Sequence, residues 1–263
     1  MTERIQQAFN TAANQSRAAF IGYLPAGYPT QAAFLEHATT LLEYADLLEI
    51  GMPYSDPLGD GPVIQKAGEV ALAGGMTVMG MFAQAAALRQ RTDKALMVMT
   101  YYNPILSIGE ERFVDAALEA GIDGLILPDL PPDEADTLIP LARAAGLKLT
   151  FLLAPTSTTD RIELVAKEST GFIYAVSVTG VTGSRVGIPA EVPLLVANIK
   201  AVTDKPVAVG FGVRTPEQAS AIAAVADGVV VGSAIVELVA AHGTDAPRHV
   251  EAYVRTLAEA VHR

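Results

Sequence analysis

The sequence predicts an α/β protein of the (β/α)8 TIM-barrel class, because eight short apolar runs alternate with segments of helical patterning. The runs are rich in Val, Ile and Leu at successive positions, which is typical of parallel strands covered by helices on one face and packed together on the other. The eight candidate strands are residues 19–24, 45–50, 95–100, 124–127, 147–153, 172–178, 206–209 and 228–231.

Helical patterning fills most of the intervals between these strands. The clearest examples are residues 110–120, 132–145, 159–168, 191–202 and 216–224. Residues 2–14 predict an extra N-terminal helix that covers the base of the barrel, and residues 247–262 predict the closing helix. No linker and no charge block interrupts the pattern, so residues 1–263 are expected to form a single TIM-barrel domain.

The composition narrows the possible partners and surroundings. The chain has 29 acidic and 18 basic residues and a net charge of -11, which disfavours nucleic acids and anionic membrane surfaces. It has no cysteine, which suits a reducing cytoplasm. Its first residues lack a signal-peptide pattern, and the uncharged stretch 70–88 contains Gly74 and Gly75, which predicts a buried helical region and not a membrane span. We therefore expect a soluble cytoplasmic protein.

Two carboxylates lie at the end of the second candidate strand and in the loop after it. Glu49 lies in an apolar run, where burial penalises ionisation and raises the pKa of a carboxyl group. Asp60 lies eleven residues later in a loop rich in proline and glycine, which can fold back over the strand end. Either residue alone is compatible with an ordinary buried pair or a turn. Together they suggest an acid and a base with separated pKa values.

Other polar and aromatic residues follow the remaining strands, at the end of a barrel where active sites are built. Tyr23 begins the segment 23–29 at the end of the first strand, residues 101–104 follow the third strand, and residues 128–131 follow the fourth. The loop 177–185, rich in Gly, Ser and Thr, is long enough to act as a lid, although an ordinary solvated loop is the alternative.

Glycines end the last two strands, at 210–212 and 232–234, each before a helical pattern. Backbone amides at such positions can bind a phosphate group, and the loops after the seventh and eighth strands often do so in this architecture. Neither stretch matches the dinucleotide-binding or the P-loop motif.

Several other chemistries lack their residues. The histidines are His37, His242, His249 and His262, and none follows a strand, so we expect neither a metal site nor a Ser-His-Asp triad. Lys205 precedes a strand instead of following one, which disfavours Schiff-base chemistry.

Across nearly its whole length the chain resembles the tryptophan synthase alpha subunit family. The motifs that carry this resemblance are LEIGMPYSDPLGDGPVIQ at 48–65, YNP at 102–104, DLP at 129–131, TGVTG at 179–183, GFG at 210–212 and GSAI at 232–235. Mild departures are Tyr23 and Tyr54, where some members have Phe, and Val178, where some have Arg.

The resemblance implies a lyase that cleaves indole-3-glycerol phosphate to indole and glyceraldehyde 3-phosphate, with Glu49 and Asp60 as the catalytic acids. In this family Asp60 would act at the indole N–H, while Glu49 would transfer protons at the indole C3 and the side-chain hydroxyl. The implied substrate contacts are Tyr23, Ile64, Tyr174 and Thr182, with Thr182 orienting Asp60. The implied phosphate contacts are Gly183, Phe211, Gly212, Gly232 and Ser233.

The resemblance also implies a partner. Members of the family dock on a beta subunit, which receives indole through a tunnel, so we expect an alpha2beta2 heterotetramer. No cofactor or metal is expected in this chain, and pyridoxal phosphate is expected in the beta partner. Proline-stiffened loops at the strand ends place the expected interface at Pro53, Asp56, Asn103 and Pro131.

Three alternatives remain open from the residues alone. A phosphate-binding barrel isomerase of the neighbouring tryptophan or histidine pathway would share the glycines but should lack the Glu49/Asp60 loop. A non-catalytic regulatory subunit should have lost a carboxylate or Thr182. A stand-alone indole-releasing lyase would keep the whole site but lack a partner.

Overall fold

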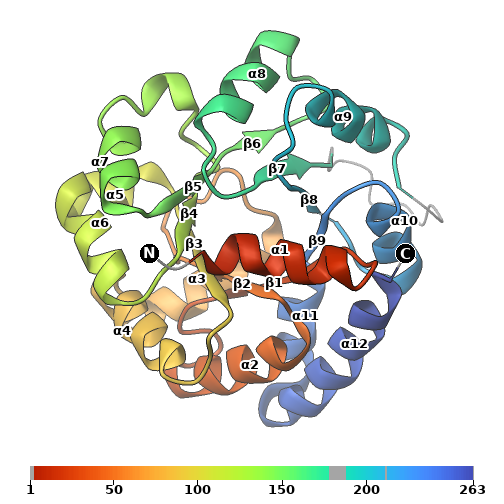
Figure 1. The fold of residues 1–263 in the computed structure, drawn as a ribbon. Coiled ribbons are helices and arrows are strands. Elements are labelled where there is room, and N and C mark those ends of the chain that lie inside the picture. Colours follow the sequence, from red (N-terminus) through yellow and green to blue (C-terminus); the bar gives the residue numbers. More distant parts are fainter. Residues whose placement is uncertain (1–2, 178–187, 211, 263) are drawn as a thin grey trace.

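The computed structural model describes residues 3–177, 188–210 and 212–262. Their strands form one parallel sheet that curls into a nearly closed barrel, with helices around it (Figure 1). Strand order is β5-β4-β3-β2-β1-β9-β8-β7-β6. The strands are β1 Ala19–Pro25, β2 Leu47–Gly51, β3 Ala95–Met99, β4 Gly124–Ile126, β5 Lys148–Thr150, β6 Leu152–Leu153, β7 Ile173–Val176, β8 Val207–Gly210 and β9 Gly228–Val231.

The predicted barrel is confirmed, and each of the eight predicted strands is present within a few residues. The prediction of one continuous strand at 147–153 was wrong, because this segment is divided into β5 and β6 at Phe151. β5 pairs with β4 and β6 pairs with β7, so the two short pieces serve different neighbours. The division lets one run of chain turn the corner at which the barrel closes.

Helices surround the barrel on the outside. Those between the strands are α2 Gln31–Tyr44, α3 Pro62–Ala73, α4 Val78–Arg89, α5 Tyr102–Ile108, α6 Glu110–Glu119, η1 Pro132–Glu134, α7 Leu138–Ala145, α8 Thr159–Glu168, α9 Glu191–Lys200 and α10 Pro216–Ala223. After β9 come α11 Ser233–His242, η2 Gly243–Asp245 and α12 Ala246–Ala260.

Three local predictions need correction, and proline and glycine explain all of them. The predicted helix 132–145 consists of the 3-10 turn η1 and the shorter α7, because two consecutive prolines begin it. The helical region 70–88 is two helices, since Gly75 has φ +83 and Thr77 caps α4. Asn103 and Pro104, predicted as a turn, lie in the first turn of α5, where the missing N–H of proline has no cost.

No single helix in the described ranges is long and apolar enough to cross a membrane. Only α3 and α4 taken together meet that test, by length and composition, and they are bent by 99° at their break.

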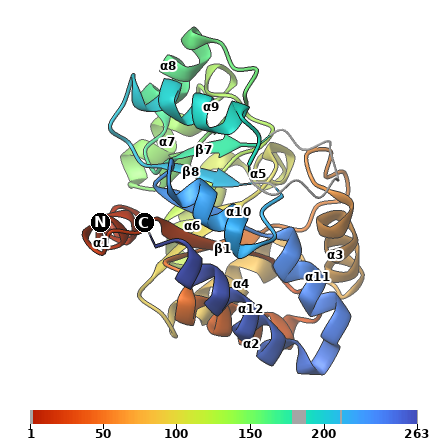
Figure 2. The same ribbon diagram turned by 90° about the vertical axis from the view of Figure 1, so that its right-hand side faces the viewer.

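The N-terminal helix α1 (Arg4–Asn14) closes the end of the barrel at which the strands begin. Ile5, Phe9 and Ala12 recur at helical spacing and pack against inward-facing strand residues. The rings of Phe9 and Phe172 lie 5.4 Å apart. Figure 2 places α1 at the left end of the barrel and α3 at the right, so the predicted cover over the base is confirmed and the opposite end stays free for a site.

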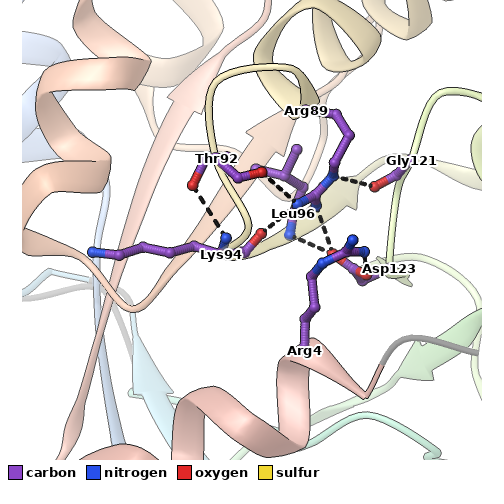
Figure 3. Close-up of polar contacts among 7 residues, drawn as sticks. All are labelled: Arg4, Arg89, Thr92, Lys94, Leu96, Gly121 and Asp123. Carbon is purple, nitrogen blue, oxygen red and sulfur yellow. Dashed lines mark hydrogen bonds and ion pairs between the residues drawn. The ribbon is translucent and has the colours of Figure 1, made fainter.

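A buried carboxylate fastens α1 to this end (Figure 3). Asp123 precedes β4, and its side chain accepts from Arg4 Nη1 at 3.0 Å, Arg89 Nη2 at 2.8 Å and the Leu96 N–H at 2.9 Å. Arg89 also donates to the carbonyl oxygens of Gly121, Thr92 and Lys94. One carboxylate therefore holds together α1, α4, β3 and β4.

Replacing this carboxylate should cost more stability than any exposed ion pair. We expect Asp123→Ala to lower the free energy of unfolding by about 3–5 kcal/mol, because it removes the counter-charge of two partly buried guanidinium groups. Urea denaturation followed by circular dichroism measures the change. Glu69→Ala, which removes an exposed pair with Lys66, is the control and should cost under about 1 kcal/mol. Equal losses in both variants would show that Asp123 does not anchor the base.

Candidate active site

A cavity opens at the end of the barrel where the strands finish. Side chains from the strands form its floor, and loops and the starts of helices form its rim. The residues that line it are Tyr23, Glu49, Asp60, Gly61, Ile64, Met99, Tyr174, Gly212, Val230, Gly232 and Ser233. Of the site residues predicted from the sequence, eight therefore meet around one cavity.

Glu49 lies in the middle of β2, two residues before the strand ends, and pairs in register with Tyr23 on β1 and Met97 on β3. The side chain is fully buried, and within the described ranges neither carboxylate oxygen has a hydrogen-bond partner. Desolvation raises the pKa of Glu49 to about 8, as the apolar run predicted. The free chain therefore holds this carboxyl group mostly protonated at neutral pH.

Asp60 reaches the same cavity from the loop between β2 and α3. The Tyr101 hydroxyl donates to its carboxylate and accepts from the Gly59 N–H at 2.9 Å. The side chain of Gln65 holds the Asp60 carbonyl oxygen at 2.8 Å. Burial raises the pKa of Asp60 to about 6, and the hydrogen bond from Tyr101 limits that rise. Asp60 is thus ionised at neutral pH.

The two carboxyl groups that line the cavity therefore differ in protonation at neutral pH: Glu49 is mostly protonated and Asp60 is mostly ionised. Their pKa values of about 8 and about 6 bracket neutral pH. Such a pair can donate a proton at one point of a substrate and accept one at another without further ionisable groups.

Tyr23 on β1 and Tyr174 on β7 wall the cavity, and each lies over a glycine of the next strand. A Cβ atom added at Gly51 would come within 2.1 Å of the Tyr23 hydroxyl oxygen, and one at Gly210 within 2.3 Å of that of Tyr174. Burial raises the pKa of both phenols, so they remain neutral. The strand glycines are therefore required because a side chain at either position would overlap the hydroxyl end of the tyrosine.

The glycines predicted to bind a phosphate lie along one rim of this cavity. Gly212 follows β8 and adopts φ +85, a conformation that side chains disfavour. Gly232 caps and Ser233 begins α11, and the first N–H groups of a helix have no partner within the helix itself. Ile64 lines the cavity from the first turn of α3. Thr182, Gly183, Phe211, Val178 and most of the predicted lid lie outside the described residues.

Known proteins share both this fold and its sequence. The sequence model of the tryptophan synthase alpha chain family matches residues 9–262. The chain is 52% identical to the tryptophan synthase alpha chain of Deinococcus radiodurans, over 91% of its own length and 89% of the relative's. It is 45% identical to that of Geobacter sulfurreducens over 98% of each. A structure of Mycobacterium tuberculosis tryptophan synthase matches with a TM-score of 0.92 and 42% identity, covering 100% of both chains.

The chain belongs to the tryptophan synthase alpha chain family. It is accordingly a lyase of tryptophan biosynthesis that cleaves indole-3-glycerol phosphate, and the resemblance seen in its motifs is confirmed. An isomerase of a neighbouring pathway is no longer a competing interpretation. The family also implies a beta-subunit partner.

The residues expected to contact that partner also lie around this end of the alpha-chain barrel. Pro53 is buried, Asp56 and Asn103 are exposed, and Pro131 is half-buried. Asn103 Nδ2 donates to the Tyr54 hydroxyl at 3.0 Å, which ties α5 to the loop that carries Asp60. Pro131 belongs to a different segment, just before η1.

Sequence reasoning missed four residues of this alpha-chain site. Met99 and Val230 line the cavity from strands, Gly61 lines it beside Asp60, and Tyr101 positions Asp60. Met99 has the same inward alternation as Met97 and could have been found from it. No pattern in the sequence predicts the orientation of the Tyr101 ring. In the described part of the chain, no group of three or more His, Cys, Asp or Glu residues could hold a metal ion.

The raised pKa of Glu49 predicts a specific dependence of stability on pH. Between the ordinary carboxyl pKa and about 8, the folded chain binds a proton that the unfolded chain has released, so stability falls as pH rises. Glu49→Gln removes this contribution. As pH rises across that window, we expect the free energy of unfolding of the variant to increase relative to that of the wild type by at most about 1.4 kcal/mol per pH unit.

Urea denaturation at pH 5, 7 and 9 measures this gain, with Glu69→Gln, an exposed carboxylate on α3, as the control. A constant difference between Glu49→Gln and the wild type at all three values would contradict a raised pKa.

Proposed function

We propose that Glu49 and Asp60 carry out the retro-aldol cleavage as two separate proton relays. Ionised Asp60 accepts the indole N–H proton while protonated Glu49 delivers one to C3, which gives the indolenine tautomer. The resulting Glu49 carboxylate then takes the proton of the neighbouring side-chain hydroxyl, so that the C–C bond breaks as the aldehyde forms. Asp60 returns its proton to the ring nitrogen, and both acids regain their starting states.

The observation that supports this division most directly is the separation of the two pKa values within one cavity. Asp60 with a pKa of about 6 is the base in the free chain, and Glu49 with a pKa of about 8 is the acid. No described residue hydrogen-bonds to the oxygens of Glu49, which leaves its proton free for a substrate, whereas Tyr101 holds the Asp60 carboxylate at the rim.

The rest of the cavity suits the two ends of the substrate. Tyr23, Ile64, Met99 and Tyr174 offer apolar walls for an indole ring. The amides near Gly212, Gly232 and Ser233 would hold the phosphate, with Gly183 and Phe211 completing the cradle and Thr182 orienting Asp60. We further propose that residues 1–263 act as one barrel domain in the cytoplasm, without a cofactor of their own.

Removing either proton relay should abolish most turnover without unfolding the chain. We expect Glu49→Gln and Asp60→Asn each to lower kcat by about 10²–10⁴-fold, because each loses one proton transfer. Indole release from indole-3-glycerol phosphate is the assay, circular dichroism checks folding, and Glu69→Gln is the control. Near-wild-type indole formation by folded Glu49→Gln would remove Glu49 from the mechanism.

We propose an alpha2beta2 complex with a pyridoxal phosphate-dependent beta subunit, docked on the strand-end face of the barrel. Indole is apolar and easily lost from an open site, so direct transfer to the next subunit protects it. The loop that carries Asp60 also exposes Leu58 to 94%, and α5 exposes Leu106 to 53%. Contact with these side chains would bias the loop through Gly59, Tyr101 and Asp60, which share hydrogen bonds.

Loss of one exposed carboxylate on this loop should weaken both association and activation. We expect Asp56→Ala to lower affinity for the beta subunit and the partner-dependent rise in kcat, measured by light scattering and indole release. Asp204→Ala, an exposed acid before β8 at the opposite end of the barrel, is the matched control. If the isolated chain already reaches the rate of the mixture and forms no complex, a stand-alone indole-releasing lyase is the better interpretation.

A further inference from the structure

Arg214 lies two residues after Gly212, in the short connection between β8 and α10, and it is not among the residues that line the cavity. Its main chain is fastened on both sides. The Arg214 N–H donates to Gln218 Oε1 at 2.8 Å, within the capping box that starts α10. The Tyr253 hydroxyl on α12 donates to the Arg214 carbonyl oxygen at 2.7 Å. In Figure 2, α10, α11 and α12 lie together on the side facing the viewer.

The Arg214 guanidinium is committed to a carboxylate on α11. Its two terminal nitrogens donate to the two oxygens of Glu237, Nη2 to Oε1 at 2.9 Å and Nη1 to Oε2. The two side chains are 49% and 41% exposed. This hydrogen bonding raises the pKa of Arg214 and lowers that of Glu237, so both groups are charged at neutral pH. The bidentate pair commits one edge of the planar guanidinium to Glu237.

The pair connects the two sides of the proposed phosphate cradle. Arg214 follows Gly212 on one side, and Glu237 lies one helical turn after Ser233 on the other. Backbone amides bind an anion well only when their N–H groups converge within a few tenths of an ångström. A link between the β8–α10 connection and α11 fixes that convergence from behind, away from the cavity.

We propose that Arg214 is a positioning residue for the phosphate group of the substrate, acting through Glu237 and not through contact with the phosphate. The inference rests on the proposed assignment of the phosphate to the amides near Gly212, Gly232 and Ser233. The pair sets the spacing of these amides, so it governs KM and leaves the proton transfers at Glu49 and Asp60 unchanged.

The direction in which KM changes in two neutralising variants distinguishes a positioning role from direct attraction of the phosphate by charge. If the Arg214 charge attracted the phosphate, Arg214→Gln would raise KM, whereas Glu237→Gln would free the guanidinium and lower KM. Positioning predicts that both variants raise KM for indole-3-glycerol phosphate by about 3–10-fold, with kcat nearly unchanged. The charge-swapped double variant Arg214→Glu/Glu237→Arg should recover most of the loss, and Arg214→Lys, which keeps the charge but loses the fork, should fall between.

The experiment uses the full chain, with steady-state kinetics of indole release and competitive inhibition by inorganic phosphate as a second readout. Arg143→Gln breaks an Arg–Glu pair of similar kind between α7 and α8 and should leave KM unchanged. Gly212→Val should raise KM more than Arg214→Gln, since it strains the cradle itself.

Opposite signs in Arg214→Gln and Glu237→Gln, or no change in either, would overturn the positioning role. A separate result would contradict the assignment of the phosphate to the amides near Gly212, Gly232 and Ser233. If inorganic phosphate does not compete with the substrate in the wild type, and Gly212→Val leaves KM unchanged, the phosphate binds elsewhere and the proposed assignment fails before Arg214 is considered.

Discussion

The burial of a carboxyl group in the barrel wall is the constraint on which the rest of the site depends. Glu49 is enclosed on β2 between β1 and β3, and its oxygens have no partner in the described part of the chain. An isolated buried charge is costly, so the group keeps its proton and its pKa rises to about 8. The protonation state of Glu49 therefore follows from what surrounds it, and a rigid strand holds such a buried polar group in one place.

Buried carboxyl groups at the two ends of the barrel differ in the hydrogen-bond donors that surround them. At the end where strands begin, Asp123 is surrounded by donors from α1, α4 and β3, and this pairing turns a buried charge into an anchor. At the other end, Glu49 receives no such donor from the described residues, and Asp60 receives a hydrogen bond from Tyr101. The buried carboxylate at the closed end thus stabilises the fold, whereas the buried carboxyl groups at the open end have raised pKa values.

Much of this architecture could be predicted from the sequence because it depends on local patterns. Apolar runs located every strand, and Gly228–Val231 has the bounds that its pattern predicted. The pair Glu49 and Asp60 was predicted from an apolar run followed by a proline- and glycine-rich loop, and both side chains line the cavity. The failures have a common cause. The break at Phe151 and the role of Tyr101 depend on neighbours distant in the sequence, and neither strand curvature nor ring direction leaves a periodic signal.

The placement of glycine illustrates how closely the site and the scaffold are coupled. Gly51 and Gly210 end strands, where glycine is ordinarily unfavourable, yet each lies beneath the hydroxyl of a cavity tyrosine on the preceding strand. A methyl group at either position would displace Tyr23 or Tyr174, and with it one wall of the cavity next to Glu49. Glycine lowers the intrinsic preference of these two positions for a β-strand. In return, each cavity tyrosine packs directly against the strand backbone, which fixes the position of its ring. The same backbone therefore defines the sheet and the shape of the cavity that the two carboxyl groups line.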